Sequence, residues 1–195
     1  MSARLKQELR KQYYAKRREI SNPIRQLAAH TAADHFVDQD VFKQSNFIAC
    51  YMPFRDEFDS TQLIQKIWHA NKSCYLPILT EKKLLYFVRY DEGDKLVTNR
   101  YSILEPENTL RKIPVGDLDL VIVPIVVFDS FGHRLGTGGG YYDRTFAFLH
   151  QHQLSKKPLM MGLCFAFQQA ELVPTDPWDI NLQAVMTEKG LIHCE

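Results

Sequence analysis

The sequence predicts one α/β domain over residues 1–195, with a largely parallel sheet at its centre. Strand-like and helix-like segments alternate along most of the chain, which is the pattern of a parallel sheet with helical connections. The run at residues 120–128 (LVIVPIVVF) is apolar throughout and predicts a central strand covered on both faces. We find no linker, internal repeat or low-complexity segment that would divide the chain into separate domains.

The first 20 residues predict a basic helix, because they carry seven Lys or Arg against two Glu and because apolar residues recur at helical spacing. Lys6, Arg10 and Arg17 fall close together on that helix, since steps of four and seven residues nearly complete whole turns. A break at residues 21–23 then starts a second helix. Its expected apolar face consists of Ile24, Leu27, Ala28, Thr31, Ala32 and Phe36.

A strand at residues 47–52 begins the alternation, and a polar turn at residues 53–60 (PFRDEFDS) follows it. A helix over residues 61–70 comes next, with Leu63, Ile64, Ile67 and Trp68 expected to face inward. We expect further strands at residues 73–79, at 83–90 near an edge, and at 118–128 in the centre. The remaining elements are a helix over residues 142–152, a strand at 158–167, and one or two short strands within 183–193.

Composition argues against several classes of protein. The formal net charge of +1 gives no global field for nucleic acid or a membrane surface. The longest apolar run has nine residues, against about 20 for a membrane span, and the charged start lacks the apolar stretch of a signal peptide. The four cysteines are scattered, which argues against a zinc site or a disulfide framework and for a reducing compartment. We expect a cytoplasmic protein without nucleic-acid or membrane partners, and we take it to be a monomer.

Five of the nine glycines lie within residues 132–140, directly after the predicted central strand. Several glycines together permit positive φ and close approach of a ligand, so that successive N–H groups can surround an anion. A helix that begins near Gly139 or Gly140 would add its positive end. The alternative is a mobile connection without a ligand, but such a connection has no need of Arg134 before it or of Tyr-Tyr-Asp-Arg after it. The segment therefore predicts a phosphate-binding loop.

The loop matches neither familiar phosphate motif. No Lys-Ser or Lys-Thr follows the glycines, and Tyr141 stands where the last glycine of GxGxxG belongs. In a parallel α/β sheet, ligands bind beyond the carboxyl ends of the strands. The turn at residues 53–60 and the segment 129–143 both follow predicted strands. We therefore expect the site between these two segments, where the basic first helix can close over them.

The segment FDSFGHRLGTGGGYYDR at residues 128–144 resembles the signature of the 5-formyltetrahydrofolate cyclo-ligase family, FDxxGxRLGxGxGYYDR. The resemblance extends to the opening segment LRKQYYAKRREIS, to YMPFRDEFDS and to WDINLQAVMT, so it covers nearly the whole chain. Every fixed position of the signature is met, which makes the resemblance highly specific. These positions are Phe128, Asp129, Gly132, Arg134, Leu135, Gly136, Gly138, Gly140, Tyr141, Tyr142, Asp143 and Arg144.

The resemblance implies a three-layer α/β/α sandwich and an enzyme that converts 5-formyltetrahydrofolate and ATP into 5,10-methenyltetrahydrofolate, ADP and phosphate, with Mg²⁺. A formamide carbon is a poor electrophile and its oxygen a poor leaving group, so phosphorylation of that oxygen explains the need for ATP. The nitrogen at position 10 of the same folate then attacks the activated carbon, and binding the folate in a bent form favours this closure. During phosphoryl transfer the protein mainly positions groups and neutralises charge.

The resemblance also implies roles for residues of the loop and of the first helix. Arg134 is the first candidate for stabilising the transferring phosphoryl group. Two roles are open to Tyr141, stacking on the pterin or holding the bent folate, and both Arg134 and Tyr141 are assigned to catalysis. Tyr142 has the same two roles open to it, or a contact with the nucleotide. Lys6 and Arg10 match ATP contacts, and their alternative is a solvated helix face. The loop residues that match ATP contacts are Arg134, Leu135, Gly136, Thr137, Gly138, Gly139, Gly140, Tyr141 and Tyr142. Those that also match folate contacts are Thr137, Gly138, Gly139, Gly140 and Tyr141.

Magnesium prefers oxygen ligands and often takes only one or two carboxylates beside phosphates and water. By the resemblance, Asp143 is one metal ligand and Asp179 the second, with Asp176 as the nearby competitor. The alternative for Asp143 is a helix cap. The family often has a basic residue at the position of Thr137 or Gly139, and this chain has none there.

Glu57 and Met52 match positions that contact the folate. A carboxylate suits the donor-rich edge of a pterin, because it can accept paired hydrogen bonds there. The alternatives are a surface glutamate in a turn, with Asp59 and Ser60 as helix caps, and a methionine that serves only packing. The folate, with one glutamate or several, has an acidic tail, and the open candidate partners of this tail are Arg55, Arg89 and Arg144.

Three functions are compatible with these residues. The first is the cyclo-ligase reaction. The second is another enzyme on a similar scaffold, such as a kinase or an isomerase of a phosphorylated small molecule, which would not need this loop or a reduced folate. The third is a binding protein without turnover, against which the presence of Arg134, Asp143 and Glu57 argues.

Overall fold

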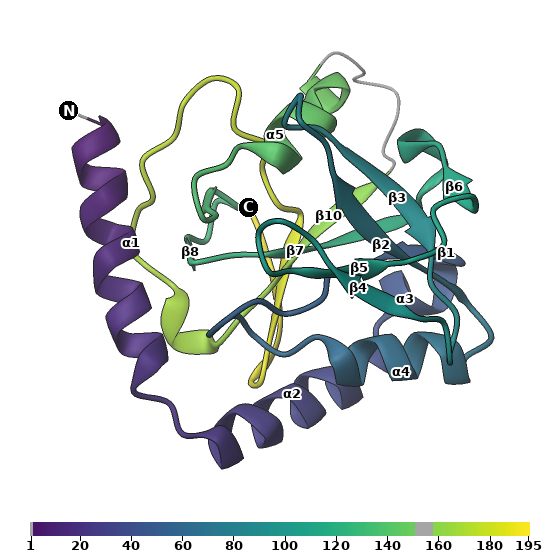
Figure 1. Ribbon diagram of the computed structural model, residues 1–195. Coiled ribbons are helices and arrows are strands. Elements are labelled where there is room, and N and C mark those ends of the chain that lie inside the picture. The colour runs from purple at the N-terminus through teal and green to yellow at the C-terminus, as the bar shows by residue number, and fades with distance from the viewer. Residues whose placement is uncertain (1, 151–157) are drawn as a thin grey trace.

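The structure, a computed structural model, describes residues 2–150 and 158–195, and an eight-stranded sheet runs through its middle (Figure 1). The strands are β1 (Phe47–Ala49), β2 (Ser73–Leu79), β3 (Leu85–Arg89), β6 (Lys112–Ile113), β7 (Leu120–Pro124), β10 (Leu159–Leu163), β11 (Ala184–Thr187) and β12 (Gly190–His193). Their order is β12-β11-β10-β7-β1-β2-β3-β6. The five strands from β11 to β2 are parallel, and only the outer strands run antiparallel. The predicted mostly parallel α/β sheet is confirmed.

The strand order reverses between β1 and β7. From β1 the chain proceeds to β2 on one side, whereas from β7 it proceeds to β10 and β11 on the other. The two strands are parallel neighbours, with Ile48 opposite Leu120 and Ala49 opposite Val121. A crevice forms beyond the carboxyl ends of two such strands, because their connections leave in opposite directions. The turn after β1 and the glycine segment after β7 both begin at this crevice.

Helical layers cover the sheet unequally. The helices α2, α3 and α4 pack on one face, with α2 and α4 below the sheet in Figure 1, and the opposite face is covered by α5, short 3₁₀ turns and loops. Separate hydrophobic clusters lie on the two faces, one around Phe36 and Ile48 and the other around Phe146 and Val121. The three-layer sandwich is thus confirmed, with one thin helical layer. The helices are α1 (Ser2–Arg18), α2 (Asn22–Val37), α3 (Asp40–Gln44), α4 (Thr61–His69) and α5 (Tyr141–Thr145).

Helix α1 stands apart from both layers, at the side of the sheet in Figure 1. Its inner face contacts segments that follow three parallel strands. The Tyr13 hydroxyl donates to the carbonyl of Gln169, beyond β10, at 3.2 Å. Arg17, which is buried, donates to Asp56, beyond β1, at 3.1 Å and to the carbonyl of Ile125, beyond β7, at 3.4 Å. Helix α1 therefore closes over these strand ends, a position that the sequence allowed but did not fix.

The long apolar run at residues 118–128 is two strands and not one. Strand β7 ends at Pro124, and β8 (Val127–Phe128) pairs with β9 (Arg134–Leu135) in a separate hairpin. The chain leaves the sheet at Ile125 and Val126, whose carbonyl groups both accept hydrogen bonds from the side chain of Gln168. These carbonyls are therefore not available for hydrogen bonds to a neighbouring strand. Both strands are buried, so apolarity alone does not reveal the break.

Other boundaries also differ from the predictions. Strand β1 stops at Ala49, and β10 stops at Leu163 because residues 166–168 form a 3₁₀ turn. The predicted helix at residues 142–152 begins as α5 and continues as a 3₁₀ turn over Ala147–His150, while its last two residues lie outside the described residues. Strand β3 is second from the edge, beside β6. An unpredicted hairpin consists of β4 (Leu96–Thr98) and β5 (Leu104–Pro106).

The buried face of α2 is made mostly of alanines. Ala28, Ala29, Ala32, Ala33 and Phe36 are buried, whereas Ile24 and Leu27 are 58% and 68% exposed. The expectation that these two residues face inward is therefore wrong. Helix α4 lies as predicted, with Leu63, Ile64 and Ile67 buried and Trp68 partly buried against the core. In the described part of the chain, no helix combines the length and apolarity that a bilayer crossing requires.

Candidate active site

A cavity of about 610 Å³ lies at the crevice between β1 and β7. Its walls come from α1, from the turn after β1, from the ends of β2 and β3, from the β4–β5 hairpin and from the glycine segment. Every site residue predicted from the sequence lines it, and so do Asp176 and Arg144, whereas Arg55 and Arg89 do not. The predicted residues are Lys6, Arg10, Met52, Glu57, Arg134, Leu135, Gly136, Thr137, Gly138, Gly139, Gly140, Tyr141, Tyr142, Asp143 and Asp179.

The cavity has two chemically different ends. The basic end lies toward β10 and is formed by α1, the glycine loop and the segment after β10; its charged residues are Lys6, Arg10, Arg134, Asp143, Asp176 and Asp179. The apolar end lies over β1, β2 and β3 and under the β4–β5 hairpin; its apolar residues are Met52, Pro77, Leu79, Leu85, Ile103 and Leu104. The hairpin residues were not among the predicted site residues, because nothing in their sequence pattern separates them from a surface loop.

The glycine loop at residues 136–140 follows β9 and leads directly into α5. Gly138 and Gly140 have φ angles of +102° and +67°, which side chains other than hydrogen rarely tolerate. Two arginines hold the loop by its carbonyl groups. Arg10 Nε donates to the carbonyl of Gly136 at 2.8 Å, and Arg144 Nη1 donates to that of Gly139 at 2.7 Å. Because its carbonyls are bound from outside, the loop is a formed structure and not a mobile connection.

Helix α5 has five residues, so its dipole is much smaller than the sequence analysis expected. Anion binding by this segment then depends on the N–H groups of the loop and on the side-chain cations around it. Gly140 is the N-cap residue of α5, and Asp143 makes no capping bond, so the helix-cap alternative for Asp143 is wrong.

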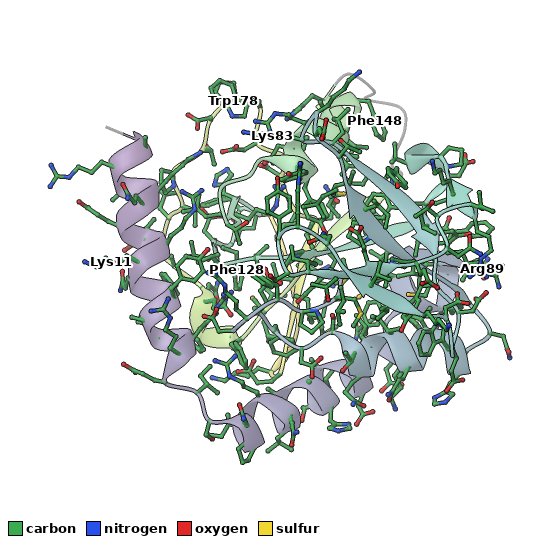
Figure 2. All side chains as sticks on the ribbon, in the orientation of Figure 1. Lys11, Lys83, Arg89, Phe128, Phe148 and Trp178 are labelled. Atoms are coloured by element: carbon green, nitrogen blue, oxygen red, sulfur yellow. The ribbon has the colours of Figure 1, made fainter. Side chains whose placement is uncertain are left out.

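Lys6 and Arg10 face the cavity and not the solvent. The Nζ atom of Lys6 lies 2.7 Å from a carboxylate oxygen of Asp176 and 2.7 Å from one of Asp179. Burial lowers the pKa of Lys6, but the hydrogen bonds and charges of the two carboxylates outweigh this effect and raise the pKa above its ordinary value. Lys6 is therefore a firmly protonated, buried cation. Lys11, on the outer side of the same helix in Figure 2, is solvent-exposed.

Arg134 is buried and paired with Asp143. Its Nη2 atom donates to Asp143 Oδ1 at 2.8 Å, and its Nη1 atom donates to the carbonyl of Ile180. The N–H of Ile180 donates to the same Oδ1 atom at 3.2 Å. The guanidinium is thus fixed at the start of the loop by two bonds, while its other N–H groups make no hydrogen bond with the described residues.

Asp143 and Asp179 retain oxygen atoms that a metal ion can use. The hydrogen bonds and ion pairs of Asp143 use Oδ1 and those of Asp179 use Oδ2, so Asp143 Oδ2 and Asp179 Oδ1 make none with the described residues. Within the described ranges no three His, Cys, Asp or Glu side chains gather into a metal cage. The donor set therefore suits a hard cation that takes its other ligands from phosphate and water.

Glu57 lies in the turn after β1, where its Oε2 atom accepts a hydrogen bond from the Phe54 N–H at 3.0 Å. Burial raises its pKa from 4.5 to about 7, against smaller opposite effects of that hydrogen bond and of Arg17. Glu57 is therefore not the surface glutamate of the alternative interpretation. Asp59 Oδ1 accepts from the Thr61 N–H at 2.9 Å at the start of α4, as expected of a cap, whereas the Ser60 hydroxyl donates to the carbonyl of Tyr51.

The two adjacent tyrosines of the loop point their hydroxyl groups to different places. The Tyr141 hydroxyl lies 3.4 Å from that of Tyr101, at the tip of the β4–β5 hairpin, so it connects the loop to the roof of the apolar end. The Tyr142 hydroxyl is buried. Trp178, beside Asp179, lies at the exposed rim of the cavity, at the top of Figure 2.

Relatives of known activity share most of this chain. A 5-formyltetrahydrofolate cyclo-ligase of Haemophilus influenzae is 36% identical over 181 residues, which covers 86% of this chain and 95% of the relative. One of Escherichia coli K12 is 35% identical over 175 residues, covering 88% and 94% respectively.

Solved structures give the same result. The 5,10-methenyltetrahydrofolate synthetase of Aquifex aeolicus has a TM-score of 0.80 and 33% identity, and the match covers 97% of this chain and 92% of that protein. A synthetase of Mycoplasma pneumoniae, at 22% identity, shares the fold with a TM-score of 0.73. The family model of the 5-formyltetrahydrofolate cyclo-ligases matches residues 2–188. The chain, with its complete loop signature and both ends of its cavity, belongs to the 5-formyltetrahydrofolate cyclo-ligase family.

Proposed function

We propose that this protein converts 5-formyltetrahydrofolate and ATP into 5,10-methenyltetrahydrofolate, ADP and phosphate, with Mg²⁺. The observation that supports the proposal most strongly is the arrangement of one continuous cavity. It has a glycine loop and three cations at one end, and an apolar wall with the half-buried carboxyl group of Glu57 at the other. The family membership and the names of the relatives agree with this reaction.

The basic end accommodates the triphosphate. The N–H groups of residues 136–140 and the cations Lys6, Arg10 and Arg134 supply hydrogen-bond donors and positive charge on one side of the cavity. Arg134 is held by Asp143 and by the carbonyl of Ile180, so its orientation is fixed before the reaction. In the proposal it stabilises the negative charge of the transferring phosphoryl group, and Lys6 and Arg10 bind the remaining phosphates.

Asp143 Oδ2 and Asp179 Oδ1 are the atoms that would hold Mg²⁺. Asp176 contributes indirectly, because it shares the cation of Lys6 with Asp179. When bound, the ion supplies charge neutralisation between phosphate oxygens. The protein's own contribution here is to hold two carboxylates at the loop, each oriented by a basic partner. Lys6 keeps Asp176 and Asp179 together, since it donates to both.

The apolar end accommodates the reduced folate. Met52, Leu79 and Leu104 provide apolar surface for the pterin and the aminobenzoyl ring. Glu57 accepts hydrogen bonds from the N–H and amino groups of the pterin edge, which compensates for the burial of its charge. Tyr141, tied to Tyr101, closes this end and holds the folate bent. Arg144, at the rim, is the one tail candidate that lines the cavity.

In the proposal, the triphosphate at the basic end and the folate at the apolar end meet within one cavity and react in two steps. The formyl oxygen attacks the γ-phosphorus, the bond to the β-phosphate oxygen breaks, and ADP leaves. The nitrogen at position 10 then attacks the activated carbon, loses its proton, and phosphate leaves with the former formyl oxygen. Because both reacting groups of the second step belong to one folate, a bent bound form supplies much of the rate enhancement.

The test is to mix the purified protein with 5-formyltetrahydrofolate, ATP and Mg²⁺ and to record the near-ultraviolet absorbance of the methenyl product. We expect product only when all three are present. Gly138→Ala places a side chain at φ +102° beside Arg10 and should lower turnover, whereas Gly116→Ala, with open space around it, is the matched control. Binding of both ligands by a folded protein that forms no product would contradict the proposal and identify a binding protein.

A further inference from the structure

Three segments far apart in the sequence meet at the outer edge of the apolar end. The turn between β2 and β3 lies beside α5, because the N–H of Leu85 donates to the Thr145 hydroxyl at 2.8 Å. The tip of the β4–β5 hairpin reaches that turn through an ion pair of 3.6 Å between Arg100 and Glu81. The same tip reaches the glycine loop through the contact of two tyrosine hydroxyls at 3.4 Å. The edge is therefore one surface, joined by specific contacts.

This surface carries four exposed cations, which we call the basic rim: Lys82, Lys83, Arg100 and Arg144. In Figure 2 Lys83 lies at the top of the molecule, where α5 lies in Figure 1. The one acidic residue of the two hairpin turns is Glu81, and its long, exposed ion pair with Arg100 is of a kind that contributes little. Lys83 makes no ion pair with the described residues. The basic rim therefore has positive charge available for an acidic ligand.

The backbone presents these cations in a fixed way. Lys83 has a φ angle of +57°, and its N–H donates to the carbonyl of Thr80 at 3.1 Å, which closes a tight turn. The guanidinium of Arg100 lies over the ring of Tyr101, 5.0 Å from its centroid. Arg144 is held at one nitrogen by its bond to the glycine loop, and its other N–H groups make no hydrogen bond with the described residues.

The apolar wall of the cavity leads from Glu57 to the basic rim. Glu57 lies in the turn after β1, and β2 and then β3 come next in the sheet. Leu79, at the end of β2, and Leu85, at the start of β3, line the cavity and flank the turn that carries Lys83. Ile103 lines it from the hairpin, just after Arg100. A folate with its pterin at Glu57 and its aminobenzoyl ring on this wall directs its glutamate toward the basic rim.

We propose that Lys83, Arg100 and Arg144 form a binding site for the glutamate carboxylates of the folate, which selects substrates with several glutamates over the monoglutamate. The inference rests on the proposed function, because it takes reduced folate as the ligand of the apolar end. Arg144 lines the cavity and meets the first glutamate, whereas Lys83 and Arg100 lie outside the cavity and meet the later ones.

The charges explain why the length of the tail matters. Each glutamate that is added through the γ-carboxyl group brings one more negative charge, farther from the pterin. A single exposed ion pair contributes little and is screened by salt, so one carboxylate gains little from one surface cation. Several carboxylates opposite several cations add their contributions, and this gain should disappear at high ionic strength.

The first test needs no variant. Calorimetric titration measures the Kd of the wild-type protein for 5-formyltetrahydrofolate with one glutamate and with three. We expect the triglutamate to bind about tenfold more tightly at about 0.05 M salt and only about twofold more tightly at about 0.5 M. Equal affinity for the two folates at the lower salt concentration would overturn the inference and leave the proposed function intact. Wild type that binds neither folate would overturn the proposed function, and this inference with it.

The second test removes two cations from the basic rim in the double variant Lys83→Gln, Arg100→Gln. Arg144 is left in place, because it also holds the glycine loop. We expect the Kd for the triglutamate to rise about tenfold, that for the monoglutamate about twofold, and that for ATP with Mg²⁺ to stay within twofold. Lys11→Gln, an exposed lysine on the outer side of α1, is the charge control and should keep the preference for the triglutamate. An unchanged preference in the double variant, or an equal loss of ATP binding, would overturn the inference.

Discussion

The two ends of the cavity differ in how their polar groups are paired. At the basic end each cation already has a protein partner: Lys6 has two carboxylates at 2.7 Å, Arg134 has Asp143 at 2.8 Å, and Arg10 has the carbonyl of Gly136 at 2.8 Å. At the apolar end Glu57 accepts one backbone hydrogen bond, and the Tyr142 hydroxyl has no partner within the described residues.

This difference indicates two ways of preparing a site for a ligand. The basic end is assembled in advance, so its charges stabilise the fold and need little reorganisation when phosphate arrives. The apolar end holds polar groups with few partners, whose burial destabilises the free protein. Substitutions at the two ends should therefore have opposite effects on stability, although both weaken function.

Arg134→Lys should have the largest effect and should break the basic end. Lysine offers one donor nitrogen in place of the two separate Nη atoms that contact Asp143 and the carbonyl of Ile180, so it should not hold the charge at the same position next to the loop. We expect kcat to fall on the order of 100-fold and the free energy of unfolding to fall by about 3 kcal/mol. Steady-state kinetics and chemical denaturation measure the two effects.

A double variant tests whether the charges at the basic end compensate each other. Arg134→Met leaves the partly exposed Asp143 without its cation, and adding Asp143→Asn removes the unpaired charge. We expect the double variant to recover part of the lost stability and none of the activity. Full stability in Arg134→Met alone would show that the ion pair contributes nothing to the fold, and the contrast between the ends would then fail.

Glu57→Gln should act in the opposite direction on stability. The KM for 5-formyltetrahydrofolate should rise about 30-fold, because the charged acceptor of the pterin donors is lost. The free energy of unfolding of the ligand-free protein at pH 8 should rise by about 2 kcal/mol, since the buried charge is removed. Asp59→Asn, in the same turn, is the matched control and should leave the KM unchanged.

The pH dependence of stability gives an independent measure of Glu57. Its pKa is about 7 in the folded protein and 4.5 ordinarily. Between pH 4.5 and about 7, Glu57 is therefore protonated in the folded protein and ionised in the unfolded chain. Its contribution to stability is therefore constant below 4.5, falls as pH rises to about 7, and is lost above that. Folate binding, which needs the ionised carboxylate, should instead tighten as pH rises through about 7. Glu57→Gln should abolish both trends.

Lys6→Met should have an intermediate effect, with Lys11→Met on the outer face of α1 as its control. Removing Lys6 leaves Asp176 and Asp179 facing each other without a cation. We expect a loss of about 1–2 kcal/mol in the free energy of unfolding and an increase of about tenfold in the Kd for ATP. Equal behaviour of the two variants would mean that Lys6 is only part of a solvated helix face.

The sequence predicted which residues form the site better than it predicted which of them are hydrogen-bonded to each other. The glycine loop was predictable because five glycines within nine residues are followed by Tyr-Tyr-Asp-Arg, and all the predicted site residues except the tail candidates Arg55 and Arg89 line one cavity. The bonds from Lys6 to Asp176 and Asp179 join positions more than 160 residues apart, and no local pattern encodes them. The burial of Glu57 was missed because a glutamate in a polar turn is normally exposed.

An element of the fold was predictable where its pattern of apolar and polar side chains was compatible with only one way of packing. Amphipathic α4 lay where its apolar residues placed it, whereas α2 buries small alanines and exposes Ile24 and Leu27. The bend after Pro124 was hidden because both β7 and β8 are buried. The strands of the β4–β5 hairpin have only three residues each, and Leu104 is 41% exposed, so the hairpin gave no clear strand signal.

Tyr101→Phe should have the smallest effect, and it should show whether the β4–β5 hairpin contributes to the apolar end of the cavity. The substitution keeps the ring and removes the hydroxyl that lies 3.4 Å from that of Tyr141, a long and exposed contact. We expect unchanged stability and a rise of about twofold in the KM for the folate, with kcat unaffected, as measured by steady-state kinetics. Deletion of the Tyr141 hydroxyl in Tyr141→Phe should give the same result, and the double variant should add nothing further, because both remove one shared contact. A large fall in kcat for Tyr101→Phe would instead place the hairpin in the chemical step, and the apolar end would then be a catalytic region rather than a binding surface.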